Sequence, residues 1–106
     1  EANKINPKVI QISSLMGSIG DNGMGGSFGY RMSKCALNMF NKSFSIEFPN
    51  MISVVLHPGW VKTDMGGDQA PTSVEESVSG MMKVIEGLTL EDTGKFIDHE
   101  GDVLPW

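Results

Sequence analysis

Cysteine and basic residues are scarce in this sequence. Its 106 residues include a single cysteine, Cys35, so no disulfide can form within the chain, which fits a reducing compartment. Lys and Arg number 8 against 13 Asp and Glu, and the net charge of −5 argues against nucleic acid as a partner. No apolar run reaches the ~18 residues of a membrane-spanning helix, and the polar residues 1–8 show no signal-peptide pattern. We therefore expect a cytoplasmic protein that binds neither nucleic acid nor a membrane.

What the sequence does contain is an alternation of strand and helix patterns. Short β-branched or apolar runs predict strands at KVIQIS (8–13), ISVVL (52–56) and residues 95–97. Helical spacing of apolar residues predicts helices over 28–48 and 74–86, the first with an apolar stripe on which Cys35 would be buried. Glycine and polar residues predict loops between these elements. Continuous apolar strands that alternate with long helices are typical of a parallel sheet covered by helices on its faces.

Three strands are few for such a sheet. A complete doubly wound nucleotide-binding fold has about six strands in two halves. We interpret residues 1–106 as a partial Rossmann-type α/β domain, the C-terminal half of a doubly wound parallel sheet with about three strands and two main helices. On this interpretation the N-terminal dinucleotide-binding half is absent.

Polar side chains follow the predicted strands at their carboxyl ends, where ligands bind in open α/β sheets. Ser13 and Ser14 end the first strand, and His57-Pro58-Gly59 ends the second. Tyr30 and Lys34 open the first helix, and a spacing of four residues places them on one helix face. An ammonium there stabilises a phenolate, so the pair suits proton transfer.

The motifs ISS (12–14), YRMSK (30–34) and HPGWVKT (57–63), in this order, resemble those of the short-chain dehydrogenase/reductase family. HPGWVKTDMGG (57–67) and FIDHEGDVLPW (96–106) are similar to the branch that contains C-factor-like and sniffer-type carbonyl reductases. The resemblance implies an NAD(P)-dependent oxidoreductase that reduces a small-molecule carbonyl, or oxidises the alcohol, by hydride transfer. NADP is slightly favoured over NAD, although the residues that would discriminate between them are not in this chain.

The same resemblance implies a role for each site residue. Tyr30 would be the proton donor, Lys34 would tune it and bind the nicotinamide ribose, and Ser14 would hold the substrate oxygen. The residues on the nicotinamide side would be Pro58, Gly59, Val61 and Thr63. No metal site is expected, because no ligand cluster surrounds Asp64 and Asp68.

The alternative is a truncated, non-catalytic homologue that acts as an interaction module. In that family the helix equivalent to residues 28–48 often forms a subunit interface, so a homodimer through this helix is a candidate assembly. The family's glycine-rich turn, its Asn-Asn-Ala-Gly stretch and its catalytic asparagine have no counterpart here. We therefore expect that the chain alone does not bind the cofactor productively.

Overall fold

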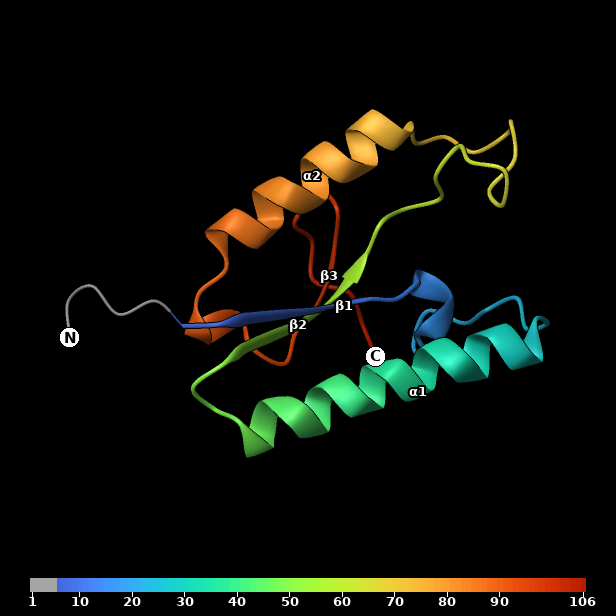
Figure 1. Cartoon of the computed structure of the whole chain (residues 1–106). Coiled ribbons are helices and arrows are strands. Elements are labelled where there is room, and N and C mark those ends of the chain that lie inside the picture. Colours follow the sequence, from blue (N-terminus) through green and yellow to red (C-terminus); the bar gives the residue numbers. More distant parts are fainter. Residues whose placement is uncertain (1–5) are drawn as a thin grey trace.

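The computed structural model describes residues 6–106, which form a parallel sheet between two helices. The elements in chain order are β1 (Lys8–Ile12), the 3₁₀ turn η1 (Leu15–Gly17), α1 (Phe28–Glu47), β2 (Ile52–His57), α2 (Val74–Gly87), the 3₁₀ turn η2 (Leu90–Asp92) and β3 (Phe96–Asp98). All strand pairs are parallel and the strand order is β1-β2-β3. Figure 1 shows α1 and α2 on opposite faces of the sheet. The predicted α/β class and element order are confirmed.

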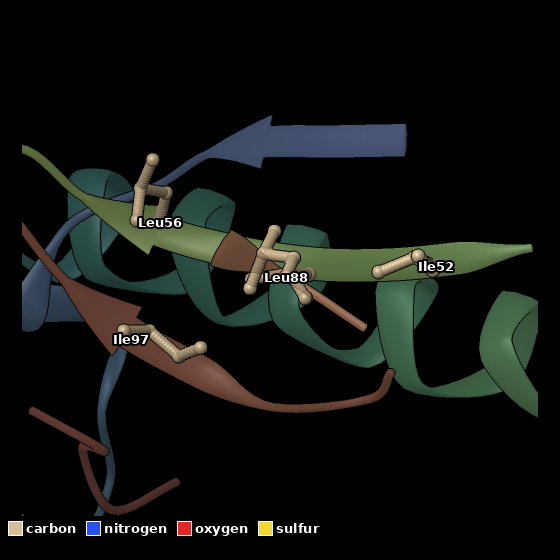
Figure 2. Packing of buried hydrophobic residues seen from close by; sticks show 5 residues of the cluster. Ile52, Leu56, Leu88 and Ile97 are labelled. Carbon is tan, nitrogen blue, oxygen red and sulfur yellow. The ribbon is translucent and has the colours of Figure 1, made fainter. Parts of the chain in front are cut away.

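The hydrophobic core lies on the α2 side of the sheet. The central strand β2 is buried from Ile52 to Leu56, and its alternate residues Ile52, Val54 and Leu56 face this side together with Leu88 and Ile97. Figure 2 shows four of these side chains gathered along β2 and β3. Partly buried residues that pack against the cluster are Ile10, Met81, Val84 and Ile85. The apolar runs of the sequence therefore form one continuous layer between α2 and the strands.

The contact between α1 and the sheet is polar instead. The buried residues of α1 are Asn38, Asn41 and Ser45, whereas Met39 is 68% exposed. The expectation that Cys35 is buried on an apolar stripe was wrong, since Cys35 is only partly buried and most of the stripe faces outward. The physical reason is that β2 presents a buried hydroxyl group on this face. Ser53 of β2 is fully buried, and its Oγ donates to Asn41 Oδ1 at 2.6 Å.

Helix α2 begins and ends as the sequence predicts. The Ser73 side chain accepts the Glu76 N–H at 3.0 Å, and the Glu76 side chain accepts the Ser73 N–H, so both ends of a capping box are present. At the other end, Lys8 Nζ donates to the Ile85 carbonyl oxygen at 2.7 Å, which neutralises part of the negative helix terminus. Within residues 6–106, neither α1 nor α2 has the length and apolar character needed to span a lipid bilayer.

The C-terminal segment packs on the body of the fold. Trp106 stacks on Phe96 with ring centroids 5.4 Å apart, and Leu104 N–H donates to the Phe96 carbonyl at 2.7 Å. Ser18 Oγ donates to the Pro105 carbonyl oxygen at 2.6 Å. The tail thus stabilises the loop that follows β1. The 3₁₀ turn η1 within this loop was not predicted from the sequence.

Candidate active site

The first side of the candidate site is the turn after β1. Ser14 precedes η1, and its Oγ accepts the Met16 N–H at 3.1 Å, which leaves the hydroxyl proton free to donate. The N–H of Leu15, the residue after Ser14, donates to His57 Nδ1 at 3.0 Å. His57 ends β2, so this hydrogen bond joins the carboxyl ends of two neighbouring strands.

The second side is the beginning of α1, where Tyr30 and Lys34 lie one turn apart. Lys34 Nζ is 5.7 Å from the centroid of the Tyr30 ring, close enough for a cation–π attraction. Tyr30 is 42% exposed, so a ligand can reach its phenol. Arg31 lies between them in sequence, and it donates to the carbonyl oxygens of Gly26 at 3.0 Å and Met16 at 3.3 Å. Arg31 therefore fastens both the start of the helix and η1.

These two sides touch at Gly17. A Cβ on Gly17 would lie 2.9 Å from the backbone carbon and the Cβ of Lys34, closer than real Cβ contacts. Only glycine lets η1 approach α1 this closely. The close approach brings the turn that begins with Ser14 against the helix segment that carries Tyr30 and Lys34.

The third side is the segment after β2. Ser77 Oγ of α2 donates to the Pro58 carbonyl oxygen at 2.7 Å. Gly59 has φ +88°, and a Cβ there would lie 2.8 Å from His99 Cε1, so both backbone conformation and space require glycine. Val61 then pairs with Thr72 in an isolated parallel bridge. Pro58 and Gly59 are thus held at the carboxyl end of β2 by contacts from α2 and from the residue after β3.

Val61 and Thr63 offer free polar groups on this third side. Within residues 6–106, the Val61 N–H donates to no other group, whereas the Lys62 and Thr63 N–H groups both do. Thr63 Oγ1 accepts the Gly66 N–H at 3.1 Å and keeps its own proton free. An open hollow of about 410 Å³ lies here, lined by Lys62, Thr63, Asp64, Gly67 and Asp68. A larger hollow of about 500 Å³ between α2 and β3 involves none of the predicted site residues.

The three sides lie at the same end of the sheet, but their hydroxyl groups do not bond to one another. Figure 1 shows the carboxyl ends of β1 and β2, the start of α1 and the loop after β2 on the same side of the molecule. In the part of the chain that the structure describes, no hydrogen bond joins the hydroxyl groups of Ser14, Tyr30 and Thr63. None of these three hydroxyl groups is therefore committed to another of them.

Burial sets the protonation of His57. Desolvation lowers the pKa of His57 below its ordinary value of 6.5, and His99 lowers it further, while the charges of Asp98 and Asp21 oppose this in part. The neutral ring is also what the hydrogen bond requires, because Nδ1 must accept the Leu15 N–H. His57 is thus a structural acceptor that joins two strand ends.

Two features at this end of the sheet were not foreseen from the sequence. Asn38 hydrogen-bonds to both ends of the turn after β1, and no motif marks it. In addition, one oxygen each of Asp98, Glu100 and Asp102 lie within 4.8 Å of one another. Asp98 Oδ1 already accepts the N–H groups of Glu100 and Asp102, so this cluster is accounted for by a turn.

Comparison with known proteins identifies relatives along nearly the whole chain. No family model matches the sequence. C-signal of Myxococcus xanthus is 46% identical over 101 residues, which are 93% of this chain and 61% of that protein. A Rhodococcus 1-hydroxy-2-glutathionyl-2-methyl-3-butene dehydrogenase is 36% identical over 105 residues, or 46% of its length.

Solved structures agree with these relatives. Carbonyl reductase Sniffer of D. melanogaster superposes with a TM-score of 0.93 at 41% identity, over 99% of this chain and 46% of that one. An NADPH-bound carbonyl reductase from chicken fatty liver gives 0.86 at 44% identity, over 93% and 42%. The chain thus spans about half the length of most of the proteins it matches. By sequence and by fold, it belongs to the short-chain dehydrogenase/reductase family.

Proposed function

We propose that this chain carries the proton-transfer and nicotinamide-side residues of an NADP-dependent short-chain oxidoreductase that reduces a carbonyl compound. The single observation that carries the proposal is the Tyr30–Lys34 pair, packed through Gly17 against the turn that bears Ser14. The C-terminal half of a doubly wound sheet would supply these groups, and the N-terminal half of such a fold would supply most of the dinucleotide site. NADP is favoured over NAD because two similar carbonyl reductases are described with NADPH or NADP bound.

The residues after β2 fit the nicotinamide end of such a cofactor. The Val61 N–H, without an acceptor in residues 6–106, and the free Thr63 hydroxyl proton are suitable donors to a carboxamide oxygen. The Lys34 ammonium suits ribose hydroxyls, and Pro58 and Gly59 form a side-chain-poor surface beside them. When bound, the cofactor would supply the hydride.

The chain's own residues would manage the substrate oxygen and its proton. Ser14 donates its free hydroxyl proton to the carbonyl oxygen and orients it towards Tyr30. The Tyr30 phenol then gives its proton to that oxygen as negative charge develops there. The Lys34 ammonium, one helical turn away, stabilises the phenolate that remains. In the direction of alcohol oxidation, the same phenolate accepts the proton.

The proposal is tested in a chimera that includes the N-terminal half of such a fold. Residues 8–106 replace the matching part of the fly Sniffer carbonyl reductase, and oxidation of NADPH by a carbonyl substrate is followed. Tyr30→Phe should lower kcat by about 10²–10⁴-fold, because it removes the proton donor, while NADPH affinity stays unchanged. Ser43→Ala, an exposed change on the same helix, is the matched control. Full turnover by Tyr30→Phe would remove Tyr30 from the mechanism.

A second candidate function is that of an interaction module, and one observation favours it. Large apolar side chains of α1 face outward, among them Phe28 at 77%, Met39 at 68% and Ile46 at 68% exposure. A partner that covers this face would be a second copy of the chain, which makes a homodimer through α1. Such an assembly is compatible with catalysis, because the sheet-facing side of α1 holds the site.

A further inference from the structure

Asn38 lies on α1 and connects the first two sides of the candidate site, the turn after β1 and the beginning of α1. It follows Tyr30 and Lys34 at the same four-residue step, so the three residues lie along one side of the helix. Unlike Tyr30, it is buried, with 3% of its surface exposed. Its amide lies where the helix passes the end of β1.

The two amide atoms of Asn38 hold both ends of one short turn. Oδ1 accepts the Ser13 hydroxyl at 2.8 Å, and Nδ2 donates to the Gly17 carbonyl oxygen at 3.4 Å. Ser13 directly precedes Ser14, and Gly17 packs against the backbone of Lys34. One buried side chain thus spans the segment that carries the proposed substrate-orienting hydroxyl.

A polar bridge of this kind fixes position more sharply than apolar packing does. An apolar helix face tolerates small shifts along a sheet, whereas a buried hydroxyl or carbonyl that loses its partner is left unsatisfied. If α1 rotated or slid, both Ser13 and Gly17 would lose hydrogen bonds to Asn38. The bridge therefore couples the place of Ser14 to the place of Tyr30.

We propose that Asn38 is a positioning residue that sets the Ser14 hydroxyl relative to the Tyr30 phenol by bridging Ser13 and Gly17. This inference rests on the proposed function, because Asn38 would act only through Ser14 and Tyr30 and would itself touch neither substrate nor cofactor. It assigns to the site a residue eight positions after Tyr30 that is named by none of the motifs.

The matched control is Asn41, one turn further along α1. It is fully buried and also bridges the helix to the sheet, through Ser53 Oγ at 2.6 Å and the Ser53 carbonyl at 3.3 Å. Its partner lies in β2, away from the turn after β1. Asn38→Ala and Asn41→Ala therefore remove equivalent buried amides, and only the first releases the turn that holds Ser14.

The experiment measures amide hydrogen exchange in the chain and in both variants. The reporters are the N–H groups of Leu15, Met16, Gly17 and Ser18, each of which is hydrogen-bonded at or within this turn. After correction for global stability through the amides of β2, Asn38→Ala should speed their exchange at least tenfold, and Asn41→Ala less than twofold. Equal effects of the two variants would reduce Asn38 to a residue that only stabilises the fold, and would overturn the proposal.

Two further measurements complete the test. Ser13→Ala removes one of the two bridges at the smallest volume change, and it should speed exchange at the same amides if Asn38→Ala does not fold. In the Sniffer chimera, Asn38→Ala should lower kcat at least tenfold at unchanged affinity for NADPH, and Asn41→Ala should not. An inactive parent chimera would reject the proposed function, while the exchange data would still decide whether Asn38 holds the turn.

Discussion

At the residue scale, the candidate site is assembled by single side chains that join neighbouring strand ends. His57 accepts the Leu15 N–H with Nδ1, so the end of β2 holds the turn after β1. Asn38 holds the same turn from α1, and Ser77 holds Pro58 from α2. The first contact requires a neutral imidazole, the second an amide and the third a hydroxyl group, which makes the site sensitive to pH and to conservative substitution.

His57 gives the first prediction, which concerns stability against pH. Its lowered pKa means that the unfolded chain binds more protons than the folded one below the ordinary value of 6.5. The contribution of His57 to the free energy of unfolding is therefore complete above that value, and it decreases as the pH falls towards the lowered pKa. Urea titrations between about pH 7.5 and pH 5.5 should show this decrease, before Glu76 and Asp92, with lowered carboxyl pKa values, begin to titrate.

His57→Asn is the informative variant. Its amide oxygen can accept the Leu15 N–H as Nδ1 does, but it does not titrate. The variant should keep most of the stability at pH 7.5 and lose much less of it on acidification. Parallel curves for the two proteins would show that His57 does not cause the pH dependence.

The positions of the site residues were predictable to different degrees. Ser14, Tyr30, Lys34 and Pro58 were placed at one sheet edge from the chain order alone, because carboxyl ends of parallel strands share an edge. Their chemical roles stay predictions. Asn38 could not be found in this way, since an asparagine inside a helix has many uses and its partners, Ser13 and Gly17, depend on tertiary packing.

At the element scale, α1 has its polarity reversed relative to an ordinary surface helix. Its buried residues are Asn38, Asn41 and Ser45, and most of its large apolar residues are exposed, while Leu37 and Phe44 are partly buried. Periodicity predicted that the helix exists and where it ends, but it could not show which face meets the sheet. A hydrophobic stripe usually indicates the buried face of a helix, but much of the stripe of α1 is exposed rather than packed on the sheet.

The second prediction is that α1 mediates self-association. Met39→Glu places a charge in the centre of the exposed apolar face without touching the core. It should raise the dimer dissociation constant at least tenfold, about 1.4 kcal/mol, as measured by sedimentation velocity over a range of concentrations. Val78→Glu, on the exposed side of α2, adds the same charge elsewhere and serves as the control. A similar shift with Val78→Glu would argue that net charge, rather than α1, governs association.

At the scale of the whole molecule, the chain would present one end of the proposed binding site. The proposed nicotinamide-side donors lie after β2, and the proposed proton donor lies on α1. Dinucleotides are usually held by a short glycine-rich turn between a strand and a helix N-terminus. In the part of the chain that the structure describes, β1 is followed by the long segment 13–27 before α1 begins, so neither helix supplies that arrangement.

The third prediction follows for cofactor binding. Calorimetric titration of the isolated chain with NADPH and with NADH should give dissociation constants no tighter than about 1 mM, or about −4 kcal/mol, because the chain offers only the proposed nicotinamide-side contacts. The Sniffer chimera, which has the glycine-rich half, should bind NADPH at micromolar concentrations under the same conditions. Micromolar binding by the isolated chain would show that residues 1–106 hold the cofactor without a second half.

The reversed polarity of α1 has a consequence for how this protein can vary. One set of residues on the helix fits the sheet and the site, and a different set faces whatever lies outside. Substitutions at Met32, Met39 or Ile46 would therefore change the exposed face while the hydrogen bonds of Asn38 and Asn41 stay as they are. If the proposed assembly and the proposed chemistry both use this twenty-residue helix, they use separate residues of it, so each could evolve or be redesigned while the other is held fixed.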